Sequence, residues 1–584
     1  MVANTNGWSV PKKTNTYADV LDAIGRASLL DELRFPKVTI RDASGEFVIE
    51  SLGDAAVPWP SISPGFPYIW VRKNEAEPPD MVLFIDYEKE REKRDIYRKW
   101  EDSTRKARNK AKQALDDQGL TAPEPAVPEI ETASILAAMR KGWWGDLQLA
   151  TWITENPAEC LSWVRYRLGA DLTEPSVIPQ ISNSQILNPI GGKGIHATKT
   201  ESRSAGSLPR QLIDPFSEWM KIRGLWRGML LYRQDDDFKF YVLEPADIGI
   251  APLVRLRDEI AAMRLWGGVR LDIEATLRCT QKLIEHSEVY AGDDATFPWM
   301  RGKTPRHFVA GLRLAYFKSL GTAAALMNDA LLPLPAWFRI ETVDDARAFV
   351  SIITETIGTF DGGIRTSGCL GSLEEKNSDD GAVLQQFRQW LLTGDLVEFI
   401  EFQKQFAIHL MARLSAGEWA RPFSTVNLDV LLIKGFDMAF ATKEIVTNTG
   451  FLNVARAIRN ATIYAAIAKK KASGGGVREV RFGLAQKWKQ KIKSGKEPLI
   501  AAISEFVQEY NWEVVNKLGP GHMVQTEDLD SVINLIEGHG ANGADLVGSL
   551  LLAYGYARAP KVATGDEQAV EADLEHADDG GIAQ

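Results

Sequence analysis

The chain has 584 residues, a formal net charge of −10, 45% apolar and 25% charged residues, and three cysteines. This composition is ordinary for a globular protein with several domains, and so few thiols argue against a secreted, disulfide-rich scaffold. The sequence contains no run of about 18 apolar residues, so we expect no membrane span and a cytoplasmic protein.

Residues 1–380 are expected to form a mixed body, so the predicted fold class is α+β. Four segments of this body have the composition of strands bounded by turns: 35–40, 81–86, 225–231 and 238–243. Four others repeat apolar residues at helical spacing: 135–168, 253–265, 271–286 and 310–327. Pro157 should divide the first of these helices, and the last two strands should pair as a hairpin.

Two segments of this body lack such periodicity. Residues 88–130 combine a highly charged stretch with a Pro-rich run, which predicts a flexible insert. Residues 175–209 are rich in Ser, Asn, Gly and Pro, and long loops of this kind are often functional. We therefore expect the loop 175–209 to carry a site.

From residue 381 to 564 the strand signal nearly vanishes, and a bundle of helices packed along apolar seams is expected. The clearest helical patterns lie at 383–414, 499–510, 529–536 and 546–551. Gly538 is placed to stop the third of these helices. The last segment, 565–584, holds seven acids and no Lys or Arg, which predicts a disordered acidic tail.

Positive charge is concentrated inside the predicted bundle, between residues 453 and 496. This segment contains a single acid, Glu479, and twelve basic residues: Arg456, Arg459, Lys469, Lys470, Lys471, Arg478, Arg481, Lys487, Lys489, Lys491, Lys493 and Lys496. Because like charges repel, such a cluster favours a polyanionic partner. Interleaved aromatic residues, Phe482 and Trp488, suit a single strand whose bases stack occasionally.

Within this segment, strand contacts are predicted for Arg456, Arg459, Arg478, Arg481 and Lys487. Arg456 and Arg459 are three residues apart and should share one face of a helix whose other side is apolar. Three glycines at 474–476 predict a flexible hinge between the basic groups. The alternative for both parts is an ordinary solvated charged surface.

A second candidate site is the sequence NPIGGKGIH at 188–196. Its glycines permit close backbone approach, and exposed N–H groups beside Lys193 could hold a phosphate. It is not a Walker A loop, because Gly194 stands where Ser or Thr would bind magnesium. Asn188 and Lys193 could instead reach base edges in a minor groove, and a plain surface loop is the other alternative.

Motifs for catalysis are absent from the sequence: it contains neither HExxH nor GxSxG. The seven histidines are scattered, and each is expected to be a surface or core residue. The turn Gly292-Asp293-Asp294 resembles a metal-binding acidic turn, but a solvated turn is expected because it lacks flanking strands. We expect no enzyme, metal or cofactor, while a nuclease with a dispersed site at Asp293, Asp294 or Asp361 is an alternative.

Three stretches carry a family resemblance: 187–194, GFLNVARAIR at 450–459 and LAYGYAR at 552–558. Together with the order of a mixed body before a basic helical bundle, they resemble the large subunit of a type I CRISPR Cascade surveillance complex, similar to type I-B. The resemblance covers residues 180–250 and 380–560. It implies a non-catalytic DNA-binding subunit that recognises a short flanking motif (the PAM), helps open the duplex, stabilises the R-loop and recruits a helicase-nuclease.

The resemblance also implies partners and site residues. The partners are guide RNA, target DNA, the helicase-nuclease, and the backbone, guide-end and small subunits of the complex. Flanking-motif contacts would come from Asn188, Gly191, Gly192 and Lys193, and contacts with the separated strands from the five cations at positions 456 to 487. An internal start at Met438 would yield a separate small subunit, unless Met438 is an ordinary internal methionine. The main alternative function is a stand-alone single-stranded nucleic-acid-binding protein.

Overall fold

The structure is a computed structural model of the whole chain. It describes residues 6–56, 58–93, 95–96, 99, 103, 146–179, 181, 187–189, 193–196, 214–234, 237–263, 265, 267–295, 302–320, 324–337, 339–361, 364–435, 439–471, 479–517 and 523–560. Most of the insert 88–130, much of the loop 175–209, Met438 and the tail 565–584 lie outside these residues. The described part confirms an α+β fold with a helical C-terminal region.

Packing divides the chain into two compact units. The first unit comprises Met1–Gly267, Arg278–Trp299 and Pro305–Leu334, and the second comprises Gly268–Leu277, Met300–Thr304 and Pro335–Gln584. The second unit therefore begins well before the predicted boundary at 380. Helix α9 (Val343–Ile357) accounts for the difference, because it packs on α12 (Thr425–Lys434) inside the second unit.

The first unit contains two antiparallel or largely antiparallel sheets. One has the strand order β1-β3-β2-β9 and the other β6-β11-β10-β8-β7, in which only the pair β6–β11 is parallel. The strands are β1 (Asn6–Pro11), β2 (Thr39–Asp42), β3 (Glu46–Ser51), β6 (Lys193–Gly194), β7 (Met229–Gln234), β8 (Asp237–Pro245), β9 (Asp247–Gly249), β10 (Val309–Ser319) and β11 (Ala324–Pro333). A further parallel pair joins β4 (Tyr68–Trp70) to β5 (Phe84–Asp86).

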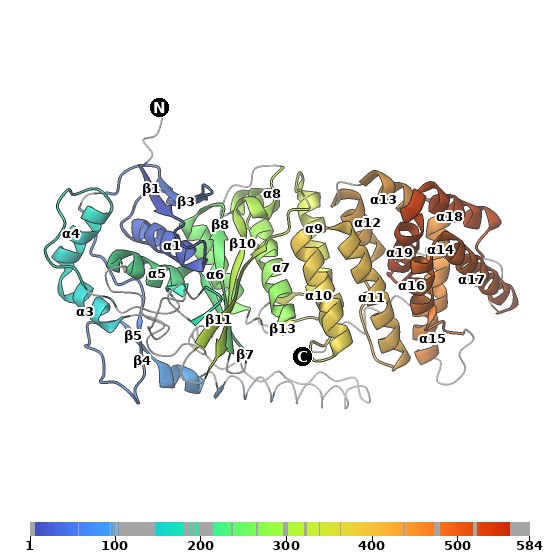
Figure 1. Cartoon of the computed structure of the whole chain (residues 1–584), viewed down its shortest axis with the longest axis horizontal. Helices are drawn as coiled ribbons and strands as arrows, with labels where there is room; N and C mark the ends of the chain where they lie inside the picture. Colours follow the sequence, from blue (N-terminus) through green and yellow to red (C-terminus); the bar gives the residue numbers. More distant parts are fainter. Residues whose placement is uncertain are drawn as a thin grey trace. The chain divides into compact units, whose positions relative to one another are not determined.

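Helices of the first unit pack on these strands mainly through α1 (Tyr17–Glu32), α5 (Pro215–Gly228) and α6 (Ile250–Ala262). The other described helices are α3 (Leu147–Glu155), α4 (Pro157–Arg167) and α8 (Glu288–Ala291), with short 3-10 turns η3 (Gly292–Asp294) and η4 (Pro305–His307), while α7 (Val269–Glu285) contributes to both units. Helices α1 and α5 lie side by side (Figure 1). Their close approach requires glycine, which has no Cβ, at two positions. A Cβ at Gly25 would lie 1.8 Å from the Met220 carbonyl oxygen, and one at Gly224 would lie 1.9 Å from the Leu21 carbonyl oxygen.

The sequence predictions for this unit are confirmed in part. The hairpin exists as β7 and β8, although residues 225–228 end α5 instead of beginning the strand. The helices predicted at 253–265 and 271–286 correspond to α6 and α7, and Pro157 begins α4 as expected.

The helix predicted at 310–327 is wrong, because this segment forms β10 and β11. Strand β10 pairs with β8 on one edge and with β11 on the other, and its residues are buried on both faces of the sheet, as Leu314 and Ala315 show. Phe317, for example, stacks on Phe238 of β8 with ring centroids 4.7 Å apart. Such a doubly buried strand has no clean alternation, and its apolar spacing also fits a helix.

The second unit is predominantly helical among its described residues. Beyond α9 and α12 it contains α10 (Ser378–Thr393), α11 (Leu396–Ser415), α13 (Ala439–Val446), α14 (Thr449–Arg459), α15 (Ala465–Lys471), α16 (Leu484–Ser494), α17 (Lys496–Lys517), α18 (Thr526–Gly538) and α19 (Gly543–Gly555). Shorter elements are strands β12 (Phe360–Asp361) and β13 (Ile364–Arg365), 3-10 turns η5 (Cys369–Ser372) and η8 (Gly540–Asn542), and a π-helical turn η6 (Asn460–Tyr464) that joins α14 to α15.

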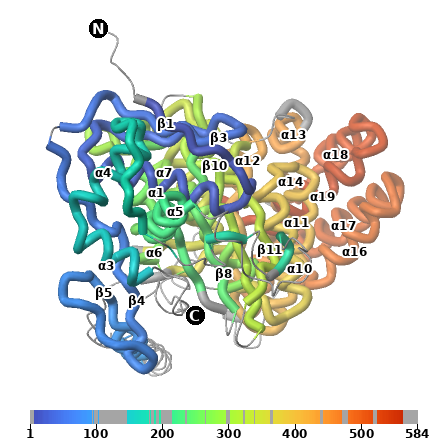
Figure 2. The backbone as a smooth tube through the Cα atoms, turned by 60° about the vertical axis from the view of Figure 1, so that its left-hand side comes forward, coloured from blue at the N-terminus to red at the C-terminus, as the bar shows by residue number. Residues whose placement is uncertain are grey.

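Local sequence explains where these helices begin. Asn377, Asp395 and Asn448 precede α10, α11 and α14, and each side chain accepts a hydrogen bond from the first turn of its helix. The buried seam forms where α14 meets α18 and α19, with Phe451 packed edge-on against Tyr554. Figure 2 shows α14, α16, α17, α18 and α19 grouped at the C-terminal end of the chain. No helix among the described residues is both long and apolar enough to cross a membrane.

Candidate nucleic-acid interface

Helix α16 is amphipathic, and its polar side is made largely of lysine. Leu484, Ala485, Trp488 and Ile492 are buried and face the neighbouring helices α17 and α19. The eleven residues of α16, Leu484–Ser494, contain four lysines and no acid. Two of these lysines, at positions 487 and 493, are exposed, and those at 489 and 491 are half-buried. The segment therefore folds so that the apolar residues hold the helix and the lysines remain at the surface.

The two interleaved aromatic residues of this segment differ in burial. Trp488 is fully buried and packs edge-on against Phe506 of α17, with ring centroids 5.6 Å apart. Phe482 is half-buried, and the ammonium of Lys469 lies 5.9 Å from its ring centroid. Trp488 therefore belongs to the core, and the predicted base stacking on it is not supported.

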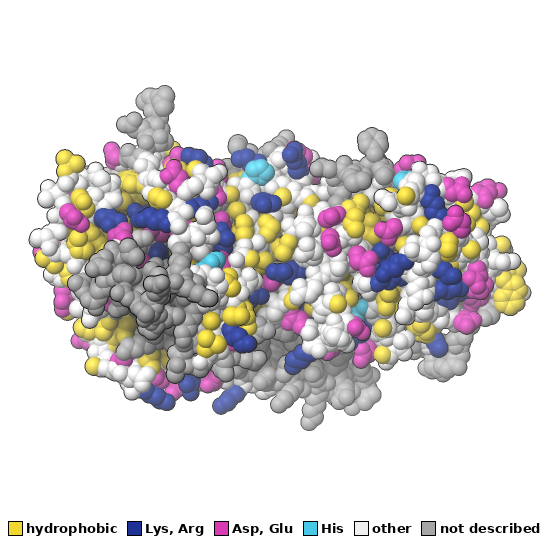
Figure 3. All heavy atoms as spheres, viewed as in Figure 1, with side chains coloured by type: hydrophobic (Ala, Val, Ile, Leu, Met, Phe, Trp, Pro, Cys, Tyr) yellow, Lys and Arg dark blue, Asp and Glu magenta, His cyan; other side chains and the backbone are white. Residues whose placement is uncertain are grey.

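Carboxylates of α17 compensate part of the positive charge. Glu505, Glu509 and Glu513 are four residues apart and so follow one face of that helix. Arg481 lies 2.9 Å from Glu509 and 3.8 Å from Glu513, and Lys487 lies 2.8 Å from Glu505. In Figure 3, basic and acidic side chains are interleaved over the C-terminal helices.

The two cations that pair with carboxylates of α17 differ in exposure. The side chain of Arg481 is only 17% exposed, and its guanidinium also lies 5.1 Å from the centroid of the Phe506 ring. Lys487 and Glu505 are each about half exposed, and the hydrogen bond from Lys487 lowers the pKa of Glu505. Exposed pairs contribute little to stability and exchange readily with other ions, so Lys487 is the more available cation.

The structure corrects the assignment of Arg459 as a strand contact. This side chain is buried, with 6% exposure, and its Nη2 donates a hydrogen bond to the Tyr554 carbonyl oxygen at 2.8 Å. Its Nε donates to the carbonyl of Ala557. Tyr554 lies in the last turn of α19 and Ala557 just beyond it, where the carbonyl end of the helix attracts a cation. Arg459 therefore fastens α14 to α19.

Arg456, three residues earlier, faces a different environment. It is half-buried, and its Nη2 donates to Asn453 Oδ1 at 3.2 Å. Asn453 in turn donates to Asp528 of α18 at 2.9 Å. The prediction that Arg456 and Arg459 share one solvent-facing side is therefore wrong, because the helix turns Arg459 inward. Arg456 stays a candidate contact.

The loop predicted to read a flanking motif is held at both of its described ends. At the first end, the Asn188 side-chain amide donates to Glu218 of α5 at 2.8 Å. Lys221 donates to the Asn188 side-chain oxygen at 3.0 Å and to Glu218 at 2.8 Å. Burial raises the pKa of Glu218 despite these donors. The Asn188 side chain thus anchors the loop to α5 within the structure.

At the second end, strand β6 attaches the loop to β11. The backbone N–H of Ile195 donates to the Leu326 carbonyl at 2.9 Å. Gly194 has a φ of +128°, and a Cβ at this position would lie 2.0 Å from the same carbonyl oxygen. Only glycine fits such a position. His196 completes the attachment through a 2.9 Å contact between its Nε2 and Asp329 Oδ2.

Several predicted residues cannot be placed. Gly191, Gly192, Arg478 and the hinge at 474–476 lie outside the described residues, as does the side chain of Lys193. The strand residues that the structure does place, Arg456, Arg481 and Lys487, all belong to the second unit, whereas Asn188 belongs to the first.

The alternative function, a nuclease with a dispersed site of aspartates, gains no support from the described residues. Asp293 and Asp294 form the exposed 3-10 turn η3 directly after α8, as expected for a solvated turn. The side chain of Asp361 lies outside the described part of the chain. Within the described ranges, no group of three or more His, Cys, Asp or Glu side chains is arranged to hold a metal ion.

The acidic face of α17 was missed at the sequence level, although its spacing was visible. Glu505, Glu509 and Glu513 repeat every four residues, and a basic helix precedes them in the chain.

Comparison with known proteins adds no further assignment: no protein-family model, no curated protein and no solved structure matches this chain.

Proposed function

We propose that this chain is the large subunit of an RNA-guided DNA surveillance complex, in which α16 and its neighbours hold a nucleic-acid strand. The observation that carries the proposal is the lysine-rich surface of α16, defined by Lys487, Lys489, Lys491 and Lys493, on a chain whose net charge is −10. A local basic surface on an acidic protein favours one bound strand over general attraction to nucleic acid.

The ion pairs of these lysines support a surface on which phosphates take the place of carboxylates. Lys487 is held by the exposed Glu505, and Lys489 lies 3.4 Å from Glu401 of α11. Phosphates would replace these carboxylates at the surface, while Arg459 and Trp488 keep the helices in place beneath it. In the proposed role the chain needs no catalytic residue, metal or cofactor and acts in the cytoplasm.

The loop 188–196 would contribute from the first unit. Its ends are fixed by Asn188 on α5 and by Gly194 on β11, so the segment between them has a defined base. A loop with fixed ends loses less conformational freedom on binding than a free one, which favours recognition of a short motif. Gly191, Gly192 and Lys193 are the proposed contact residues, and Asn188 positions them.

The proposed function is tested by comparing the chain alone with its native assembly. The full-length chain purified alone should bind a fluorescent single strand weakly. An assembly isolated from the source cells through a tag on the chain should contain RNA, and it should bind DNA complementary to that RNA tightly in a fluorescence-anisotropy titration.

Two outcomes would contradict this expectation. Equally tight binding of any single strand by the isolated chain would favour the stand-alone single-strand-binding protein. An assembly that contains no RNA and binds neither DNA nor RNA would remove the guided complex altogether.

A further inference from the structure

Side chains from three different elements form a hydrogen-bonded array in the second unit. The Oγ of Ser372 lies 3.0 Å from Nε2 of His409, and Nδ1 of the same ring lies 2.8 Å from Oδ1 of Asp380. A carboxylate can only accept, so Nδ1 carries the hydrogen and Nε2 accepts from the serine hydroxyl. This is the order of nucleophile, base and orienting acid found in serine hydrolases.

Each member of the array is held by a different element. Ser372 ends the turn η5, which Arg270 of α7 fastens by donating to the Leu370 carbonyl at 3.1 Å. Asp380 lies in the first turn of α10, and its second oxygen accepts the backbone N–H of Glu374 at 2.9 Å. His409 projects from α11. The array is therefore built by tertiary packing.

Burial and charge suit the three roles. His409 and Asp380 are each 8% exposed, whereas Ser372 is half-buried and so is the most exposed of the three. Burial lowers the pKa of His409 below its ordinary value of 6.5, Asp380 and Glu418 oppose this shift, and Arg413 adds to it. The imidazole is thus neutral and able to accept a proton at neutral pH.

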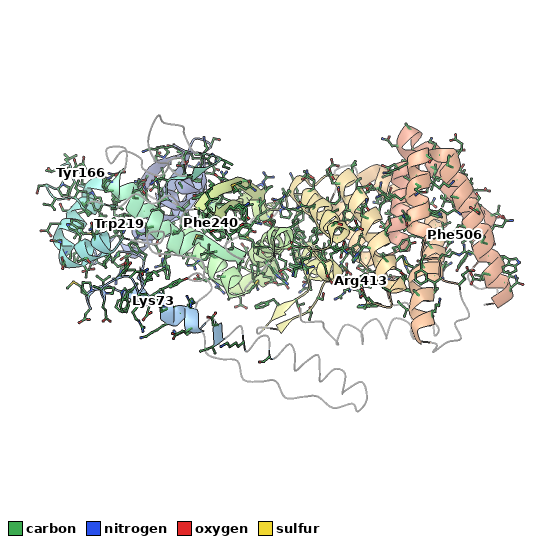
Figure 4. The ribbon with its side chains drawn as sticks, turned by 60° about the horizontal axis from the view of Figure 1, so that its bottom comes forward. Lys73, Tyr166, Trp219, Phe240, Arg413 and Phe506 are labelled. Atoms are coloured by element: carbon green, nitrogen blue, oxygen red, sulfur yellow. The ribbon has the colours of Figure 1, made fainter. Side chains whose placement is uncertain are left out.

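Arg413, labelled in Figure 4, lies one helical turn after His409 on α11. Its guanidinium lies 2.7 Å from Glu418 and 3.9 Å from Glu374. Asp380, Arg413 and Glu418 are the charged groups that act on the imidazole, and Glu374 acts through its pairing with Arg413.

We propose that Ser372, His409 and Asp380 form a nucleophilic site that hydrolyses a small carboxylic ester. Ser372 Oγ attacks the carbonyl carbon while Nε2 of His409 takes its proton. The C–O bond to the leaving alcohol breaks, and His409 returns the proton to that alcohol. Water then attacks the acyl-serine with the same proton transfers, releasing the carboxylic acid and restoring Ser372. Asp380 is a positioning residue.

This activity is independent of strand binding, because no member of the array belongs to α16 or to the loop 188–196. A small acyl group is proposed because Ser372 is half-buried and the substrate carbonyl has to reach its Oγ.

Covalent labelling of the full-length chain tests the proposal. A biotinylated fluorophosphonate should modify Ser372, identified by mass spectrometry, and the chain should hydrolyse p-nitrophenyl acetate. Ser372→Ala and His409→Gln should each lower both rates by about 100-fold or more. The matched control is Ser504→Ala, which removes a half-buried hydroxyl that donates to the Ile500 carbonyl of α17. It should change neither rate.

The pH dependence separates a reactive site from a structural clamp. Because protonated His409 cannot accept the serine proton, the labelling rate should be constant above about pH 6.5 and fall as the pH drops below it. Asp380→Asn should depress labelling even at high pH, because an amide can donate to Nδ1 and reverse the tautomer. Labelling of Ser372 no faster than that of Ser504, in a wild-type chain that is folded by circular dichroism, would overturn the proposal and leave a clamp between η5 and α11.

Discussion

Replacing Arg459 with methionine should lower the free energy of unfolding of the second unit by about 3 kcal/mol. The buried guanidinium donates to the carbonyls of Tyr554 and Ala557, and a hydrogen bond from a charged donor contributes about 1.5–3 kcal/mol. Methionine has a similar length but no donor, so the Ala557 carbonyl would lose its charged partner. Urea titration followed by circular dichroism measures the change.

Arg456→Met is the matched control, because it removes the same side chain three residues earlier on α14. Arg456 is half-buried and bonds Asn453 through one nitrogen, so its replacement should change the free energy of unfolding by no more than about 0.5 kcal/mol. The transition of the second unit has to be resolved from that of the first, since two units need not unfold together. Equal destabilisation by the two variants would contradict the anchoring role of Arg459.

Replacing Lys487, Lys491 and Lys493 with glutamine should weaken binding of a strand by the native assembly by about 100-fold at about 0.1 M salt. Each phosphate contact on a single strand contributes about 0.7 to the slope of log affinity against log salt, so the slope should fall by about 2. Lys489 is left unchanged because its side chain, 18% exposed, lies 3.4 Å from Glu401 of α11, so its replacement would also disturb the packing of α16 on α11.

A control of equal charge is available elsewhere in the second unit. Arg347, Lys376 and Lys443 are exposed residues outside α16, and their joint replacement by glutamine removes the same charge. This control should leave both the affinity and the salt slope unchanged. A salt slope that stays the same in the α16 variant, or that falls equally in the control, would exclude the lysine-rich surface of α16 as the site of strand contact.

How much of this molecule follows from its sequence depends on the range of the interactions involved. The helical patterns predicted at 383–414, 499–510, 529–536 and 546–551 follow from local apolar spacing and are confirmed, although the first is divided into α10 and α11 at Gly394, which the prediction missed. Strands β10 and β11 were not predicted, because they are stabilised by pairing inside a sheet in which β10 joins β8, a partner far away along the chain, and β11 pairs with β10. Apolar spacing alone does not distinguish a doubly buried strand from a helix.

For the site residues too, local sequence does not show which side chains are buried by tertiary packing. Arg456 and Arg459 have the same chemistry and lie three residues apart, yet only the packing of α14 on α19 decides which one turns inward. The positive charge between 453 and 496 was visible, but its compensation by Glu505 and Glu509 depends on how α17 folds back beside α16. Likewise, Ser372, Asp380 and His409 share no local motif, so no search along the sequence would join them.

The structure also changes what the glycine-rich loop implies. Asn188 was predicted to contact nucleic acid, but its amide is engaged by Glu218 and Lys221 at the base of the loop. Replacing Asn188 would therefore act through the position of the loop. Contacts with a ligand are expected from the residues that follow it.

The most direct test of strand binding on α16 is crosslink mapping in the native assembly. Ultraviolet irradiation of the assembly, followed by mass spectrometry of the nucleotide-linked peptides, identifies the protein segments that lie against nucleic acid. Crosslinked peptides from Leu484–Ser494 are predicted, with others expected near Arg456. An assembly that contains nucleic acid but yields crosslinks only outside α14 and α16 would contradict the proposed surface.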